Sequence, residues 1–163
     1  MDSEHLSDIE LIRSGAIKGR EALEILDDGH FVFHGSDEDL NALEPRQAYN
    51  WKSGEKVPDG EPAVFAADSI DVAIFMAIRK GLQGKSGFSK KEDETGYTFC
   101  MSKELASNLE KLPDKTGYVM VMPKDSFEKI GGEYRSEIEV KPEFVVKVSK
   151  KDLPAKIDIP EDY

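Results

Sequence analysis

Side chains capable of acid-base or electrostatic chemistry occur at two places in the sequence. His34 ends the short apolar run Phe31–His34, and Glu133, Glu137 and Glu139 share one face of a strand predicted much later in the chain. An imidazole can exchange a proton near neutral pH, and a carboxylate can stabilise positive charge that develops during a reaction. Both sets of residues also have a purely structural interpretation. His34 can be a structural or surface histidine at a strand end, and the glutamates can form the solvent-exposed face of a half-buried strand.

Aromatic side chains offer platforms on which a planar ligand could stack. Phe65 and Phe75 are ten positions apart, one on a predicted strand and one on the helix that follows it. Tyr49 and Trp51 lie in a polar loop, where they could cover a ligand or anchor the loop. Taken singly, Phe65 and Phe75 fit the hydrophobic core better than a ligand platform.

The cysteine and histidine content predicts that the protein holds no metal and no intrachain disulfide. Cys100 is the only cysteine, and we expect it to be a small buried hydrophobic residue. The three histidines, His5, His30 and His34, lack the close spacing that metal sites require.

The hydrophobic pattern predicts elements that place these residues at strand ends and in loops. Strands are predicted over Phe31–His34, Ala63–Ala67, Tyr97–Met101, Gly117–Met122, Glu133–Val140 and Phe144–Val148. Helices are predicted over Ser3–Asp28, interrupted at Gly15, and over Ser69–Lys80 and Lys103–Leu112. Connections without regular structure are predicted over Ser36–Pro62 and Gly84–Gly96, the first unusually long and the second mobile.

These elements predict one α+β domain of two packed, mostly antiparallel sheets that form a split cleft. A chain of 163 residues can bury one good core but not two comfortable ones. We divide it into an N-terminal helical extension (residues 1–29), the α+β domain (30–150) and a polar C-terminal tail (151–163).

Charge and hydropathy limit the classes of partner. A net charge of -11 argues against nucleic acid, because non-specific affinity for a polyphosphate needs a basic face. Apolar runs are too short to cross a bilayer, and the first residues do not resemble a secretory signal, so we expect a cytoplasmic protein without membrane contact. Local basic clusters could still meet a small anion; they comprise Arg46, Lys52 and Lys56, and Lys80, Lys85, Lys90 and Lys91.

Three stretches, taken together, resemble the histidine class of the ADP-ribosyltransferase superfamily, which includes diphtheria toxin and the poly(ADP-ribose) polymerases. Phe31–Ser36 is similar to its first motif, a strand that ends in His-Gly-Ser or His-Gly-Thr. Val64–Ser69, leading into a helix, resembles its second motif, and Ser136–Val140 offers the Glu-x-Glu of some members as the third. The match in order and spacing runs from about His34 to Val148.

The resemblance implies an ADP-ribosyltransferase-like fold and an enzyme that consumes NAD. It implies that Glu137 or Glu139 stabilises the oxocarbenium-like transition state, with Glu133 as a further candidate for the third motif. It implies NAD-binding roles for His34, Gly35, Ser36, Arg46, Phe65 and Phe75: Gly35 permits close approach, the two phenylalanines stack on nicotinamide, and Arg46 or a lysine offsets the pyrophosphate charge.

The expected activity is transfer of ADP-ribose from NAD to an unidentified acceptor, a protein among the candidates, or hydrolysis of NAD. Phe65 and Phe75 replace the tyrosines usual in this class, so a catalytically inactive binding module of the same fold, associated with phages or mobile elements, is the alternative. The RNA 2′-phosphotransferases that share the fold need a basic face, which the net charge of -11 disfavours.

Overall fold

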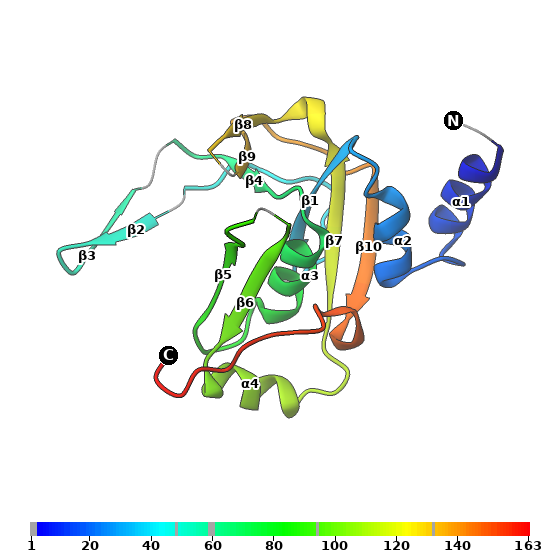
Figure 1. The fold of residues 1–163 in the computed structure, drawn as a ribbon. Helices are drawn as coiled ribbons and strands as arrows, with labels where there is room; N and C mark the ends of the chain where they lie inside the picture. Colours follow the sequence, from blue (N-terminus) through cyan, green and yellow to red (C-terminus); the bar gives the residue numbers. More distant parts are fainter. Residues whose placement is uncertain (1–2, 48, 59–60, 94, 132) are drawn as a thin grey trace.

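A computed structural model describes residues 3–47, 49–58, 61–93, 95–131 and 133–163, and the side chains of residues 3–6 and 49–52 lie outside this description. The helices are α1 (Ser3–Ser14), α2 (Gly19–Leu26), α3 (Ile70–Arg79) and α4 (Lys103–Glu110), as Figure 1 shows. The strands are β1 (Phe31–Ser36), β2 (Tyr49–Lys52), β3 (Glu55–Pro58), β4 (Val64–Ala66), β5 (Ser86–Lys90), β6 (Tyr97–Met101), β7 (Thr116–Pro123), β8 (Glu128–Ile130), β9 (Glu133–Ser136) and β10 (Phe144–Ser149).

The central sheet is antiparallel, in the order β1-β7-β10, so that β7 has a partner on each side. Val119 and Val121 of β7 belong to the hydrophobic core shared with the helices, whereas Met120 and Met122 belong to a second core on the other side of the sheet. Successive side chains of a strand point to opposite faces, so both faces of β7 are buried, as its unbroken apolar run predicts.

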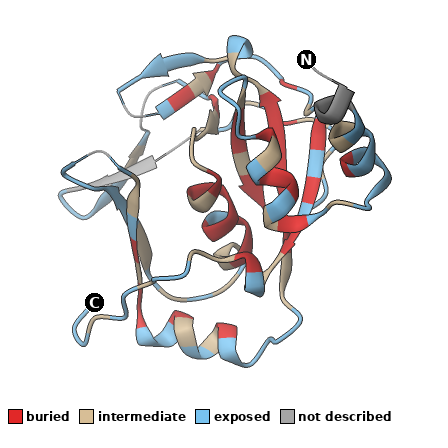
Figure 2. Cartoon of the chain, turned by 45° about the vertical axis from the view of Figure 1, so that its right-hand side comes forward, coloured by how far each residue is buried: buried red, intermediate tan, exposed pale blue. Residues whose placement is uncertain are grey.

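Helix α3 lies directly on the central sheet. Ser69 caps its N-terminus by accepting a hydrogen bond from the backbone N–H of Val72 at 3.2 Å. A Cβ atom on Gly35 would lie 2.1 Å from the carbonyl oxygen of Ala73, and one on Gly117 would lie 2.5 Å from that of Ala77. Both glycines are therefore required by the close approach of this helix, whose buried surface is visible in Figure 2.

The second sheet, β4-β9-β8, lies on the other face of the central sheet. Its Val64 and Tyr134 side chains pack in the core with Met120 and Met122. Among the described residues, the two sheets are joined by an antiparallel bridge in which Phe33 and Ala67 exchange two hydrogen bonds of 2.8 Å. Beyond this bridge, the described residues of β1 and β4 form no further backbone pairs.

The N-terminal helices pack on the domain, as the sequence predicts. Leu23 and Leu26 of α2 are at most 1% exposed and belong to the core cluster that contains α3 and β10. Asp152, in a short 3₁₀ helix after β10, accepts a hydrogen bond from the backbone N–H of Arg20 at 3.2 Å. The start of α2 is thus fastened to the C-terminal part of the chain.

Two predicted connections contain regular structure, so these predictions are wrong in part. The predicted loop Ser36–Pro62 includes the β2–β3 hairpin, which projects from the body of the molecule in Figure 1. The predicted mobile loop Gly84–Gly96 includes β5, which pairs with β6 along its whole length. Short strands with mostly polar side chains lack the apolar alternation on which a sequence-based prediction depends.

The predicted strand Glu133–Val140 ends after its first half. The hydroxyl of Ser136 accepts a hydrogen bond from the N–H of Ile138 and donates one to its carbonyl oxygen, which makes a local turn. Ile138 is 71% exposed instead of sharing a buried face with Tyr134. Val140 is buried again, in a single bridge to Leu43.

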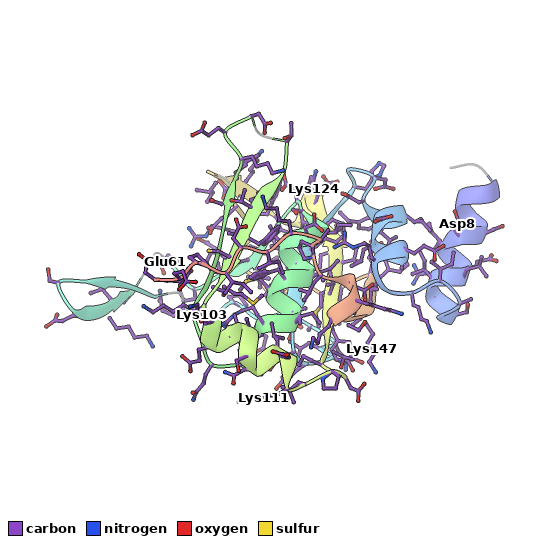
Figure 3. All side chains as sticks on the ribbon, turned by 60° about the horizontal axis from the view of Figure 1, so that its bottom comes forward. Asp8, Glu61, Lys103, Lys111, Lys124 and Lys147 are labelled. Atoms are coloured by element: carbon purple, nitrogen blue, oxygen red, sulfur yellow. The ribbon has the colours of Figure 1, made fainter. Side chains whose placement is uncertain are left out.

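The predicted polar tail is held against the domain. Asp158 pairs in parallel with Cys100, accepting from the N–H of Met101 and donating to the carbonyl of Phe99, both at 2.9 Å. The chain thus forms an α+β fold with four described helices and several antiparallel sheets. Charged side chains such as Asp8 and Lys111 lie on its outer surface in Figure 3, and none of the described helices is long and apolar enough to span a membrane.

Candidate functional site

His34 lies where the two sheets separate. It directly follows Phe33, which is bridged to Ala67 immediately after β4. Its ring nitrogen Nδ1 is 2.7 Å from the carbonyl oxygen of Phe65 in β4. Because a carbonyl oxygen can only accept, Nδ1 carries the proton and Nε2 of the neutral ring is left as an acceptor. The imidazole therefore links the diverging strands with a fixed tautomer.

The surroundings of His34 favour its neutral form. Burial lowers the pKa of the imidazole below 6.5, and the positive charges of Lys80 and Arg46 lower it further, while the hydrogen bond to the Phe65 carbonyl opposes them. At neutral pH the ring is consequently uncharged. A ligand group at Nε2 would have to be a hydrogen-bond donor, such as a hydroxyl.

Two adjoining cavities lie beside His34, and we call them the polar lobe and the aromatic lobe. The polar lobe has a volume of about 520 Å³ and extends from His34 along the segment that follows β1. The aromatic lobe has a volume of about 290 Å³ and lies between β4, α3 and the β5–β6 hairpin. His34, Phe65 and Lys80 line both lobes, so the two lobes join at these residues and form one groove.

Aromatic rings from two hairpin strands and from β4 line the aromatic lobe. Phe65 belongs to β4, Phe88 to β5 and Tyr97 to β6. The rings of Phe88 and Tyr97 meet edge to face with centroids 5.9 Å apart, and Phe88 is 44% exposed. Burial raises the pKa of Tyr97, and the nearby carboxylate of Asp68 raises it further. The lobe offers apolar ring surfaces and one neutral hydroxyl, which suit a small planar ring.

Of the three glutamates considered for the third motif, Glu133 lines the groove. It begins β9 and lies in the wall of the aromatic lobe, with His34 and Phe65. Glu137 and Glu139 are exposed in the segment after β9 and are not among the residues that line either lobe. Of these three glutamates, the structure thus brings Glu133 into the groove that contains the imidazole.

Cations and carboxylates both line the polar lobe. The backbone of Arg46 pairs with Ala63, just before β4, and this bridge places the arginine in the wall of the lobe. Lys80, directly after α3, lines both lobes. The lining also includes three exposed carboxylates, those of Asp37, Glu38 and Glu44. Lys80 and Arg46 are close enough to His34 for their positive charges to lower the pKa of its imidazole.

The remaining predicted residues differ in their placement. Ser36 is 2% exposed, accepts a hydrogen bond from the N–H of Glu38 at 3.1 Å and lines the polar lobe. Gly35 lines the aromatic lobe, but the contact that requires a glycine there is with α3 and not with a ligand. Phe75 is 1% exposed and stacks on Phe99 with centroids 5.1 Å apart, so its ring belongs to the core and to neither lobe.

Some lining residues were not predicted from the sequence. Phe88 and Tyr97 were assigned no role, because the strand β5 that brings them together was not predicted. Met76 of α3 also lines the aromatic lobe; its 36% exposure on a largely buried helix distinguishes it only once the structure is known. The side chains of Tyr49 and Trp51, predicted to cover a ligand or anchor the loop, lie outside the described residues.

The groove has donors and ring surfaces for an organic ligand. Within the described residues, no group of three or more histidine, cysteine, aspartate or glutamate side chains could hold a metal ion.

The chain was compared with models of protein families, with curated proteins and with solved structures, and none of them matches.

Proposed function

We propose that the groove binds NAD, and that the protein transfers the ADP-ribose part to an acceptor or releases it by hydrolysis. The observation that supports this proposal is that the two lobes share His34, Phe65 and Lys80. A flat apolar lobe and a larger lobe with cations at the junction correspond to a planar ring joined to a nucleotide through charged phosphates.

Each part of NAD can be assigned to a group of residues that line the groove. The nicotinamide ring fits between Phe65 and the Phe88–Tyr97 pair, and the pyrophosphate fits at the cationic middle beside Lys80 and Arg46. The neutral imidazole of His34 offers Nε2 as an acceptor for a ribose hydroxyl. Orientation of the ribose by these contacts would be a large part of catalysis.

Glu133 supplies the charge that this reaction requires. Cleavage of the bond between nicotinamide and ribose creates positive charge on the ribose, and a carboxylate beside it stabilises the transition state more than the bound substrate. Glu133 lies in the wall of the aromatic lobe, where the ring and its ribose would meet. The nicotinamide then leaves, and water or an acceptor group takes its place.

The second candidate is a binding module that holds a nucleotide or a peptide without turnover. It is favoured by the position of Glu137 and Glu139 outside the groove and by the burial of Phe75 in the core. Both candidate functions use the same groove and the same fold. They differ in whether the bound ligand is cleaved.

Titration calorimetry with NAD, nicotinamide and ADP-ribose, together with a nicotinamide-release assay on the full chain, tests the proposal. We expect NAD to bind and nicotinamide to be released; NAD binding without release would identify the binding module. Lys80→Ala should weaken NAD binding about tenfold, because it removes a cation at the junction of the lobes. Lys85→Ala is the matched control, since this exposed lysine lines neither lobe. A folded protein that neither binds nor consumes NAD would exclude the proposal.

A further inference from the structure

Phe65 lines both lobes of the groove and also binds the imidazole of His34 through its backbone carbonyl. The residue is part of the lining of both the polar and the aromatic lobe. Its carbonyl oxygen accepts the hydrogen bond from Nδ1 of His34 at 2.7 Å. Whatever fixes Phe65 therefore also determines the shape of the groove on both sides of the imidazole.

Arg135 is the residue that contacts the Phe65 ring from the neighbouring strand. The two residues are direct partners in the antiparallel pairing of β4 with β9. The guanidinium carbon of Arg135 lies 5.0 Å from the centroid of the ring, within the distance of a cation–π interaction. Arg135 itself lines neither lobe.

The guanidinium is held over the ring by one further contact. Its Nη2 donates a hydrogen bond to the carbonyl oxygen of Glu61 at 3.3 Å. Its Nε is buried and has no hydrogen-bond partner within the described part of the chain. Stacking on an aromatic face suits a planar guanidinium whose donors are not all engaged, and a lysine ammonium could not reproduce it.

We infer that Arg135 is a positioning residue that orders the ring of Phe65 as the common wall of both lobes. Affinity for a planar ring in the aromatic lobe then depends on a side chain that the ligand does not touch. The inference rests on the proposed function for the identity of that ligand. The arrangement of Arg135 and Phe65 is independent of it.

A double-mutant cycle measures whether Arg135 acts through Phe65. The dissociation constants of nicotinamide and NAD are measured for the wild type, Arg135→Ala, Phe65→Leu and the double variant. Arg135→Ala should weaken binding by about three- to tenfold, the range of a partly desolvated cation–π contact. In the Phe65→Leu background the same substitution should have almost no effect, because the ring that it positions is absent. Equal losses in both backgrounds would overturn the inference.

A readout without ligand separates this inference from the proposed function. NMR relaxation of a ¹³C-labelled Phe65 ring in the free protein should show a lower order parameter in Arg135→Ala. Lys129→Ala is the matched control, because Lys129 on the same sheet places its Nζ 5.8 Å from the Tyr134 ring and lines neither lobe. It should change neither ring order nor affinity.

The outcomes are distinct. Unchanged order of the Phe65 ring in Arg135→Ala overturns the positioning role, whatever the ligand. If the Phe65 ring is less ordered in Arg135→Ala, and the wild-type protein binds neither NAD nor nicotinamide, the positioning role is supported and the proposed function is excluded. Reduced order together with weakened binding supports both.

Discussion

The two halves of the segment from Glu133 to Val140 have the same alternation of polar and apolar residues but different structures. The first half is β9, which pairs with β4 on one side and with β8 on the other. The second half leaves the sheet, and Ile138 is 71% exposed while Tyr134 is 7% exposed. Alternation therefore specifies a strand only where neighbouring strands provide hydrogen-bond partners.

The difference also separates glutamates that the sequence leaves equivalent. Glu133 is brought into the aromatic lobe because β9 is paired with β4, which carries Phe65. Glu137 and Glu139 follow the turn at Ser136 and lie outside both lobes. Backbone pairing, and not the local sequence pattern, assigns a carboxylate to the site.

The largest expected effect distinguishes the carboxylates of the two halves. Glu133→Gln should lower the rate of nicotinamide release about 100- to 1000-fold, the range found when one charge-stabilising group is removed. NAD affinity and thermal stability should change little, because Glu133 is exposed. Glu137→Gln is the matched control and should leave the rate unchanged. Equal losses in both variants would remove the distinction between the two halves.

The apolar residues of the two halves should differ in their contribution to stability. Tyr134→Ala should lower the free energy of unfolding by about 3 kcal/mol, because the ring is buried with Met120 and Met122. Ile138→Ala should change it by less than about 0.5 kcal/mol, the usual size for an exposed position. Urea denaturation of both variants measures the contrast, and similar losses would show that Ile138 is packed in solution.

The turn that divides the halves can be weakened at one hydroxyl. Ser136→Ala removes the two hydrogen bonds to Ile138 at a position that is 6% exposed, and should cost about 1 kcal/mol of unfolding free energy. Hydrogen exchange of the Ile138 amide should accelerate in this variant. An unchanged exchange rate would mean that the turn is held by something other than the serine.

The smallest expected effect concerns the pH dependence of stability and arises from His34 of β1. Burial lowers the folded-state pKa of His34, so below about pH 6.5 the unfolded chain binds more protons than the folded one. The stability that the neutral ring contributes is complete above pH 6.5 and is lost as the pH falls through the lowered pKa. His34→Gln should flatten this slope, measured as the free energy of unfolding between about pH 5 and pH 8; equal slopes in the wild type and in His34→Gln would contradict the burial.

Much of the fold could be predicted from the sequence because the apolar segments are distinctive. The strand around Val119 and the helix capped by Ser69 are confirmed, since a continuous apolar run and a cap with helical periodicity each have one straightforward interpretation. The strands β5 and β8 were missed, because their side chains are mostly polar and only their pairing with β6 and β9 makes them strands.

The site was predictable only in outline. The sequence indicates His34 and Phe65, because each belongs to a compact motif at a strand end, and both line the groove. The sequence could not tell whether Phe75 lies in the core or in the groove. Helix α3 is apolar on two faces, and the fold determines which side chains of the helix enter the core. Nor could the sequence indicate Tyr97, whose position depends on a hairpin made of polar residues.

Helix α3 touches the backbone of the central sheet at Gly35 and Gly117, with no side chain of the sheet between them. Its spacing from the sheet is therefore set by contact between main-chain atoms, which cannot be compressed. The backbone of α3 behind the aromatic lobe, to whose lining it contributes Ala73 and Met76, is accordingly fixed relative to the sheet. In the proposed site, a bulkier ring would have to be accommodated on the side of the facing hairpin, which carries Phe88 and Tyr97.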